Sequence, residues 1–193
     1  MKRLLLLLIL PLPFCSYEQK WAKNFDFVDQ FICDLSRVGK DNKIGYADIN
    51  GKIVIPLVYD EGLSFREGYT AVRKGNTWVY FDSIGKQVSD GQYQDAQDFH
   101  NGMAAVMKND YYGYIDITGK VVIDFQFNNA RCFSEGLGPI SNARGLWGYI
   151  DGKGKIMISP QYDFADSFDN GEARVMKDGK TFYIDKQNKM LHE

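Results

Sequence analysis

The chain has 193 residues, 45% hydrophobic and 25% charged, which is typical of one folded domain or a short repeat array. Its formal net charge is −2, whereas nucleic-acid-binding proteins usually carry a basic excess, so we predict no nucleic-acid partner. Aromatic residues reach 15%, glycines number 19 and prolines only five, which favours short strands joined by turns and excludes a disordered polymer.

The N-terminus carries two basic residues, Lys2 and Arg3, followed by an uninterrupted apolar run at 4–10. A short basic region before a short apolar run is typical of a secretory signal peptide. The run is too short to cross a bilayer as a helix, which takes about 20 residues. We therefore predict a signal peptide at 1–15 and an exported protein; a buried strand of the fold is the alternative for the apolar run.

Cys15 directly follows the apolar region and precedes Ser16. This arrangement resembles the lipidated cysteine of a bacterial lipoprotein, although Phe14 stands where that pattern has a small residue. No Ala-x-Ala cleavage site precedes Ala22 either. Cys15 is thus a lipidation candidate. The expected location is the periplasm, the cell envelope or the outside, and a lipid on Cys15 is the only membrane contact that we predict.

After a short linker at 16–24, the chain is dominated by a repeat. Tyrosines recur at spacings of 34, 34, 35 and 34 residues, each two residues before an aspartate: Tyr46, Tyr80, Tyr114, Tyr149 and Tyr183. Such self-similarity predicts tandem structural units, so most recurring residues are expected to build the fold. The array spans 25–193, with a half unit at 25–44, units beginning at 45, 79, 113 and 148, and a truncated unit from 182.

Each unit contains three short runs that are β-branched or aromatic and bounded by turn residues, as expected of strands. Examples are 78–82 for the first run, 53–55 for the second and 70–73 for the third. Asp48 and Gly51 suit the turn between the first two runs, because Asp accepts backbone hydrogen bonds and Gly tolerates a positive φ. We predict three antiparallel strands per unit, in the order third, first, second run.

The remaining segment of each unit places its anchors at i, i+3 and i+6, as at Tyr162, Ala165 and Phe168. This spacing predicts a helical or 3-10 turn that inserts aromatic rings between neighbouring sheets.

Glycine occupies one strand position in three units, at Gly45, Gly113 and Gly148, which suggests a close backbone approach between sheets. Val79 and Phe182 stand there in the other two units, so their contacts should differ.

A three-stranded unit cannot bury its own apolar face, so the units must stack on one another. We predict an all-β fold of tandem three-stranded antiparallel sheets, forming a curved solenoid or an incomplete propeller-like array. Because fractional units stand at both ends, we favour the open form, although the two fractions could also complement each other and close a ring. A Cys33–Cys132 disulfide would require that ring, and two free, partly buried thiols are expected instead.

The fourth unit reads Leu-Trp-Gly-Tyr-Ile-Asp at 146–151, then Gly-Lys-Ile-Met-Ile at 154–158 and Pro-Gln-Tyr-Asp at 160–163. This pattern resembles a WG (KWG) repeat protein over essentially the whole array. The other units depart from the Trp-Gly pair, with Ile-Gly at 44–45, Trp-Val at 78–79, Tyr-Gly at 112–113 and Thr-Phe at 181–182. The resemblance implies a bacterial, often exported, β-rich repeat protein without catalytic residues to carry over.

The sequence offers no constellation of residues that predicts catalysis. Its only histidines are His100 and His192, and it lacks a Cys-x-x-Cys, a histidine pair and a phosphate-binding glycine loop. Glu67, Glu135 and Glu172 are spread along the array rather than converging as a glycosidase pair would. We therefore predict a protein that is not an enzyme and has no cofactor or metal.

Aromatic residues that do not recur are freer to bind a ligand, namely Trp21, Tyr69, Phe81, Tyr111, Tyr112 and Phe125. Among them, Tyr69, Phe81, Tyr111 and Tyr112 are the candidate contacts for a ligand or partner. The predicted function is an exported, non-enzymatic binding or scaffold module at the bacterial cell envelope, whose partner is an unknown envelope protein or glycan. The alternative is a glycan-binding or glycan-active envelope protein.

Overall fold

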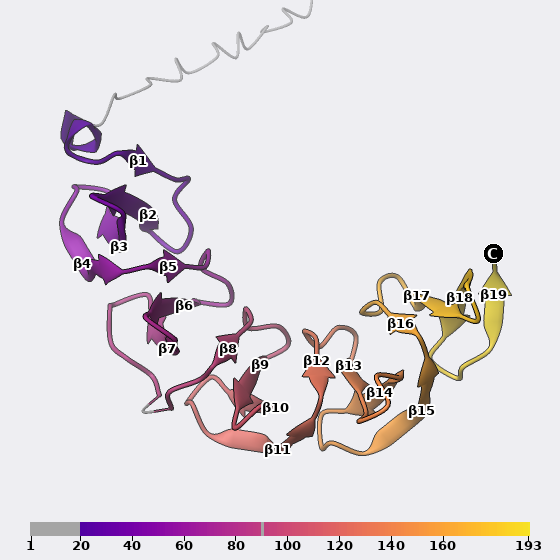
Figure 1. Cartoon of the computed structure of the whole chain (residues 1–193). Coiled ribbons are helices and arrows are strands. Elements are labelled where there is room, and N and C mark those ends of the chain that lie inside the picture. The colour runs from indigo at the N-terminus through magenta and orange to yellow at the C-terminus, as the bar shows by residue number, and fades with distance from the viewer. Residues whose placement is uncertain (1–19, 90) are drawn as a thin grey trace, which may run out of the picture.

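The computed structural model describes residues 20–89 and 91–193, so the predicted signal peptide and Cys15 lie outside the described residues. The described chain is all-β apart from one 3-10 helix, η1 (Lys20–Asn24). Its strands form five small antiparallel sheets, which follow one another along an open arc (Figure 1). The predicted all-β tandem array and its open, curved form are confirmed.

We number the sheets 1 to 5 along the chain, and each is built from strands consecutive in sequence. Sheet 1 contains β1 (Phe27–Val28), β2 (Leu35–Lys40), β3 (Lys43–Asp48) and β4 (Ile53–Tyr59). Sheet 2 contains β5 (Glu61–Gly62), β6 (Tyr69–Lys74) and β7 (Thr77–Asp82). Sheet 3 contains β8 (Asp95–Ala96), β9 (Met103–Lys108), β10 (Tyr111–Asp116) and β11 (Val121–Phe127). Sheet 4 contains β12 (Asn129–Ala130), β13 (Leu137–Ser141), β14 (Trp147–Asp151) and β15 (Ile156–Tyr162). Sheet 5 contains β16 (Phe164–Ala165), β17 (Glu172–Lys177), β18 (Lys180–Asp185) and β19 (Met190–His192).

Sheets 1, 3, 4 and 5 have one strand more than predicted. A two-residue strand precedes the third, first and second runs, which pair in the predicted order. The long last strands β4, β11 and β15 run along the convex side of the arc, so the short strands lie toward its concave side (Figure 1).

These short strands lie in the segments predicted to be helical or 3-10 turns, so that prediction was wrong. The spacing of Tyr162, Ala165 and Phe168 has another cause, because Tyr162 ends β15, Ala165 pairs with Val175, and Phe168 precedes a turn. The segment is an extended chain with a bend on either side of a short strand.

The fractional units at both ends complete whole sheets. Residues 25–44 supply β1 and β2 to sheet 1, and residues from 182 supply the end of β18 and all of β19 to sheet 5. Cys33 and Cys132 are free thiols, as predicted. Cys33 is exposed rather than partly buried, whereas Cys132 is half-buried as expected.

The recurring aspartates form turns, as their spacing predicts. In all five turns the Asp Oδ1 accepts hydrogen bonds from the backbone N–H groups two and four residues later, at 2.8–3.1 Å. The glycine three residues after the aspartate has a φ of +80° or +81° in four turns, at Gly51, Gly85, Gly119 and Gly154. Asn188, also at positive φ, replaces it in the fifth.

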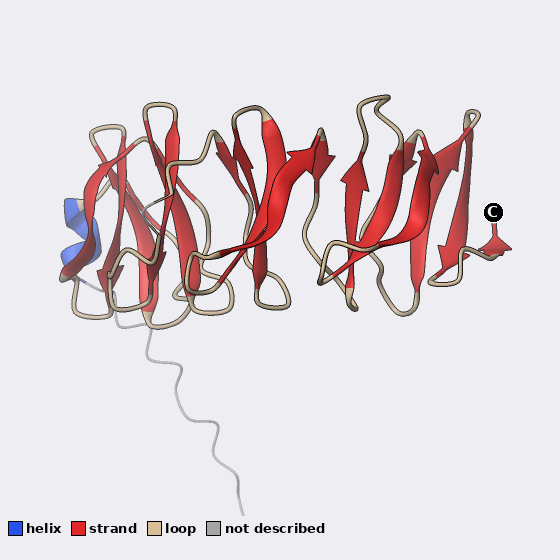
Figure 2. Cartoon of the chain, turned by 90° about the horizontal axis from the view of Figure 1, so that it is seen from below, coloured by secondary structure: helices blue, strands red, loops and turns tan. Residues whose placement is uncertain are grey.

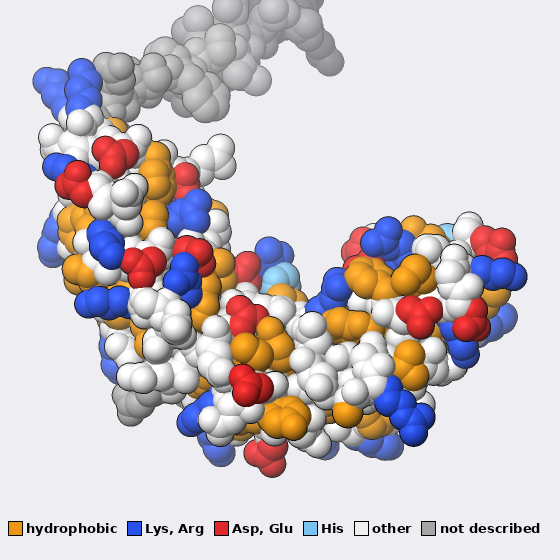
Figure 3. All heavy atoms as spheres, viewed as in Figure 1, with side chains coloured by type: hydrophobic (Ala, Val, Ile, Leu, Met, Phe, Trp, Pro, Cys, Tyr) orange, Lys and Arg blue, Asp and Glu red, His pale blue; other side chains and the backbone are white. Residues whose placement is uncertain are grey.

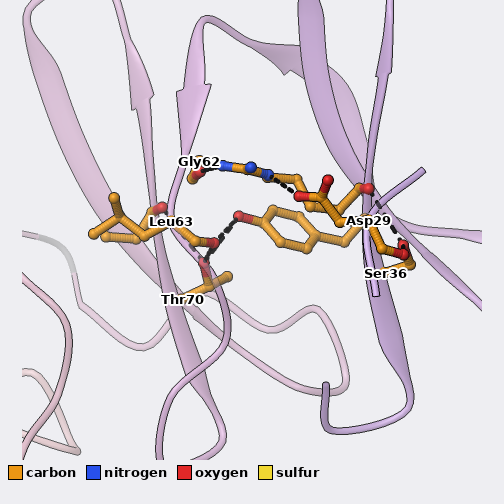
Figure 4. A network of polar contacts seen from close by, with 8 residues as sticks. Asp29, Ser36, Gly62, Leu63 and Thr70 are labelled. Atoms are coloured by element: carbon orange, nitrogen blue, oxygen red, sulfur yellow. Dashed lines mark hydrogen bonds and ion pairs between the residues drawn. The ribbon is translucent and has the colours of Figure 1, made fainter. Parts of the chain in front are cut away.

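The recurring tyrosines join neighbouring sheets. The first four are at most 1% exposed, and each hydroxyl donates a hydrogen bond of 2.5–2.9 Å to a backbone carbonyl of the next sheet: Tyr46 to Leu63, Tyr80 to Gln97, Tyr114 to Arg131 and Tyr149 to Asp166. Figure 4 shows the first junction, where Thr70 Oγ also donates to the Leu63 carbonyl at 2.6 Å.

Aromatic packing accompanies each of these hydrogen bonds, so the core lies between the sheets. Each of these four tyrosines packs at a ring-centroid distance of 4.8–5.2 Å on a phenylalanine of the next sheet: Tyr46 on Phe65, Tyr80 on Phe99, Tyr114 on Phe133 and Tyr149 on Phe168. The residues predicted to be architectural are therefore the inter-sheet core.

The recurring strand glycine leaves room for the last strand. A Cβ on Gly45, Gly113 or Gly148 would lie 2.4–2.6 Å from a carbonyl oxygen of that strand, far inside van der Waals contact. The last strand of the same sheet therefore crosses directly over this glycine. The close approach lies within each sheet, so the prediction of an approach between sheets was wrong.

The last strand is absent or short where this glycine is replaced. Among the described residues of sheet 2, which carries Val79, only isolated bridges such as Trp78 with Tyr93 follow β7. In sheet 5, β19 pairs with Tyr183 and Ile184 but does not reach Phe182. The predicted difference at Val79 is confirmed. The one at Phe182 stays a prediction, because β19 is followed only by Glu193.

The first and last sheets, at the two ends of the array, differ in how their outward faces are covered. On sheet 1, Trp21 of η1 packs edge-on against Phe31 at 6.2 Å and its indole N–H donates to the Ile49 carbonyl at 3.0 Å. Trp21 thus covers Phe31 as the tyrosine of a preceding sheet would, although its hydrogen bond goes to a carbonyl of the aspartate turn. On sheet 5, Tyr183 stacks on His192 at 4.5 Å and makes no hydrogen bond through its hydroxyl within the described residues.

Candidate binding surfaces

The four predicted contact residues differ in accessibility. Tyr111 is 47% exposed, whereas Tyr112 is half-buried and its hydroxyl donates to a carboxylate oxygen of Asp95 at 2.6 Å. Tyr69 is half-buried against Phe99. Phe81 is only 7% exposed and belongs to the core between sheets 1 and 2, so the prediction of a contact role for Phe81 was wrong.

The remaining three aromatics do not form one surface. Tyr69 begins β6 and pairs with Asp82, beside the aspartate turn at one end of sheet 2. Tyr111 begins β10 and pairs with Lys108, at the hairpin on the opposite end of sheet 3. A partner that contacts Tyr111 and Tyr112 would therefore not reach Tyr69 on the same face.

The recurring glutamates hold neighbouring turns together. Glu67 accepts hydrogen bonds from the backbone N–H groups of Asn101 and Gly102, at 2.8 and 2.9 Å, in the next sheet. Glu135 accepts from the Gly171 N–H and pairs with Lys186 at 3.0 Å. These carboxylates serve separate junctions, as the sequence predicts.

A cluster of ionisable side chains lies where sheets 2, 3 and 4 meet. Burial raises the pKa of Asp98, and burial together with the Arg66 charge lowers the pKa of His100. Asp98 Oδ1 is buried without a hydrogen-bond partner.

A thiol beside this cluster, that of Cys132, is poorly suited to catalysis. Burial raises the pKa of the Cys132 thiol to about 11, and Sγ donates to Gln97 Oε1 at 3.4 Å rather than to a base. A thiol in this state is a weak nucleophile at neutral pH. Within 20–89 and 91–193, no group of three ligand side chains could hold a metal ion. The same residues include no helix long and apolar enough to cross a bilayer.

The concave side of the arc, visible as the hollowed edge in Figure 3, contains the most distinctive side-chain arrangement. Arg131 lies over the ring of Trp147 at 4.9 Å and over that of Phe164 at 4.5 Å, and it pairs with Asp166 at 3.2 Å. Such cation–π contacts fix a guanidinium group in place while leaving its edge accessible.

This arginine borders a hollow of about 450 Å³. Its lining comes from three sheets, and includes Gln97, Asn129, Arg131, Cys132, Trp147 and Ser167. We call this site the concave hollow. Trp147 belongs to the intact Trp-Gly pair of the fourth unit and is 9% exposed. Sequence reasoning missed the site because its residues are distant in sequence and Arg131 has no arginine at its repeat positions.

Comparison with protein families gives one match. The family model described as WG containing repeat matches residues 44–78, 80–112, 112–142 and 147–180. No protein of curated function matches the chain.

Comparison with solved structures gives several similarities of fold. The chain is similar to Hsv2p of Kluyveromyces lactis, with 12% identity and a TM-score of 0.53 over 86% of this chain and 62% of that one. It is similar to a eukaryotic initiation factor, with 10% identity and a TM-score of 0.53 over 82% of this chain and 52% of that one. The WD40 beta propeller domain of Doa1 matches with 9% identity and a TM-score of 0.46 over 87% of this chain and 71% of that domain. The chain thus spans less than two thirds of Hsv2p and of the initiation factor, and at these identities the similarity concerns the fold alone.

Proposed function

Since the chain belongs to the family of WG-containing repeat proteins, matched in four repeats across 44–180, we propose that it is an exported, non-enzymatic binding or scaffold protein of the bacterial cell envelope. In this proposal the partner is an envelope protein that docks on the concave side of the arc. Repeat arrays commonly bind through such extended concave surfaces.

One observation carries this proposal. Four of the five recurring tyrosines, together with the recurring aspartates and glutamates, form hydrogen bonds within the array, whereas the concave hollow combines non-recurring polar groups with an arginine held over two aromatic rings. Arginine and tryptophan are the side chains most often found at the energetic centre of a protein interface. The partly exposed Arg131, with a side-chain exposure of 35%, is therefore the residue that we expect to contact the partner.

Affinity capture from an envelope extract of the source organism tests the proposal, with residues 16–193 as bait. We expect one dominant protein partner, and we expect Arg131→Gln to reduce its recovery by about tenfold or more. Arg174→Gln is the matched control, because Arg174 pairs with the same Asp166 and lies over the same Phe164 without lining the concave hollow. Equal recovery by both variants would remove Arg131 from the binding surface, and an empty capture would oppose a protein partner.

Glycan binding is the second candidate and uses the same bait. The motivation is the presence of amide and hydroxyl side chains beside Trp147 in the concave hollow. Arg131 covers that ring at 4.9 Å, which disfavours sugar stacking and ranks this candidate lower. A polysaccharide array that binds the unaltered bait more strongly than the Arg131→Gln variant would reverse the ranking, and hydrolysis of a bound polysaccharide would indicate an enzyme.

Export and lipidation form a separate proposal, since Cys15 lies outside the described residues. Expression of the full chain in a bacterium should yield a mature protein that begins at Cys15 and carries diacylglycerol, detected by intact-mass measurement. Cys15→Ala should abolish the lipid mass. An N-terminus beyond Cys15, without lipid, would instead indicate ordinary secretion.

A further inference from the structure

Most of the large hydrophobic side chains that remain exposed lie at the same end of each sheet, at or beside the aspartate turn. Of fourteen such residues in the described chain, ten lie in an aspartate turn or in the first two residues of the strand that follows it. They are Ile49, Ile53, Ile84, Ile117, Val121, Val122, Ile156, Met157, Met190 and Leu191, with exposures of 36–79%. Every sheet contributes at least one, so the pattern is a property of the whole array.

A lysine accompanies these side chains in every sheet. It stands four residues after the turn aspartate, or just before the last strand: Lys52, Lys86, Lys120, Lys155 and Lys189. All five are exposed, and none forms an ion pair within the described residues. Each aspartate is fixed inside its turn by two backbone N–H groups, so the lysine side chains are free to extend beyond it. We call these ten hydrophobic residues and five lysines the lysine–apolar rim.

The turns that carry the rim lie close to the preceding sheets. A Cβ placed on Gly85 would lie 2.9 Å from a Val54 methyl carbon, and one on Gly154 would lie 3.2 Å from a methyl carbon of Ile123. The turns of sheets 2 and 4 therefore pack against the preceding sheets. The loops of the array lie at two levels, one at each end of the strands, and the aspartate turns share one of them (Figure 2).

We propose that the lysine–apolar rim is a lipid-binding surface, by which the array lies against a membrane with anionic headgroups. Aliphatic side chains beside exposed lysines match the boundary between acyl chains and anionic headgroups. Lysine is suited to this boundary because its aliphatic stem can remain among apolar groups while its ammonium reaches the headgroups. The lysine–apolar rim provides the same kind of contact in all five sheets and lies at one level, which suits a planar surface.

Protection of strand edges is the simpler explanation for part of the pattern. Lysines on an exposed edge strand prevent pairing with other chains. That explanation does not account for Ile49, Ile84 and Ile117, which lie in turns and are 57%, 79% and 42% exposed. A protein-binding patch would usually centre on aromatic residues, and the rim contains none.

Sedimentation with lipid vesicles tests the proposal. The protein is residues 16–193, which include every described residue but not the apolar run at 4–10. Vesicles of phosphatidylcholine with phosphatidylglycerol should bind it, those of phosphatidylcholine alone should bind it less, and added salt should weaken the binding. Lys120→Glu with Lys155→Glu should lower the affinity by about tenfold or more. Val122→Ser with Met157→Ser should also lower it, whatever the salt concentration.

Control variants at the opposite ends of the strands distinguish an effect of the rim from an effect of the overall charge. Lys74→Glu with Lys108→Glu makes the same change of charge on two exposed lysines at hairpin ends, and Val58→Ser removes an exposed aliphatic side chain outside the rim. These variants should bind within about twofold of the unaltered protein. Equal losses in both sets, or no vesicle binding, would overturn the proposal.

Self-association abolished only by the rim variants, without vesicle binding, would identify the rim as a contact between copies. Far-UV circular dichroism checks that each variant is folded. This test is independent of the concave hollow.

Discussion

At the scale of single residues, the tyrosine hydroxyls show how one atom joins two sheets. Tyr114 is fully buried and donates to the Arg131 carbonyl at 2.9 Å, so its removal leaves a buried acceptor without its partner. We expect Tyr114→Phe to lower the free energy of unfolding by about 1–2 kcal/mol in urea denaturation. Tyr183→Phe is the control, because the Tyr183 hydroxyl has no carbonyl partner among the described residues, and its effect should be close to zero. Equal losses would mean that the hydroxyl contributes through solvation alone.

The same tyrosines predict sensitivity to alkaline pH. Burial raises the pKa of Tyr46 from 10.0 to about 12, and burial likewise raises the pKa of Tyr80, Tyr114 and Tyr149. The unfolded chain therefore loses its phenolic protons first, so this stabilisation is complete below pH 10 and is lost progressively as the pH rises toward 12. The urea midpoint should fall across that interval, with phenolate absorbance rising as the protein unfolds. Full phenolate absorbance in protein that is still folded would contradict the prediction.

At the scale of one sheet, the strand glycine leaves room for the last strand to cross over it. A Cβ on Gly148 would lie 2.4 Å from the Ile158 carbonyl oxygen and 2.6 Å from the Pro160 nitrogen, both backbone atoms that cannot rotate away. We expect Gly148→Ala to cost about 2–3 kcal/mol of unfolding free energy. Gly152→Ala in the same sheet should cost much less, because its Cβ would meet only the flexible end of Met103 at 3.5 Å. Similar losses would show that the crossing strand does not explain the cost at Gly148.

Sequence reasoning was most reliable where local chemistry decides the structure. An aspartate followed three residues later by glycine has few alternatives to a turn, and these turns formed as predicted. The short strands were missed because two residues, such as Phe164 and Ala165, carry no periodicity of their own. Their pairing with β17 depends on residues that follow several positions later, so the local spacing of Tyr162, Ala165 and Phe168 was mistaken for a helical one.

At the scale of the whole molecule, each sheet should be stabilised mainly by its neighbours. Trp21 takes the place of a neighbour for sheet 1 through its contacts with Phe31 and the Ile49 carbonyl. We expect Trp21→Ala to speed amide hydrogen exchange in β1 to β4, to affect sheet 2 weakly, and to leave sheets 3 to 5 unchanged. Uniformly faster exchange, measured by mass spectrometry, would mean that the array unfolds as one cooperative unit instead.

The candidate surfaces depend on this larger scale, which is why the sequence predicted them poorly. Non-recurrence identified Tyr69 and Tyr111 as distinctive, but not that they lie at opposite ends of the strands. Phe81 was misjudged because its partner, Tyr59, belongs to the preceding sheet. Arg131 meets Trp147 and Phe164 only once β12, β14 and β16 are brought together.

The bond from each tyrosine hydroxyl to the following sheet also bears on how such an array changes through gene duplication. Every internal junction has a hydroxyl on one side and a carbonyl on the other, as with Tyr149 and Asp166. An in-frame copy of one unit, inserted between sheets 4 and 5, could bond to the tyrosine hydroxyl on one side and to the backbone carbonyl on the other. The register of every other unit would stay the same. Recombination can therefore change the length of the arc in steps of one unit, so the number of units encoded by the gene sets that length.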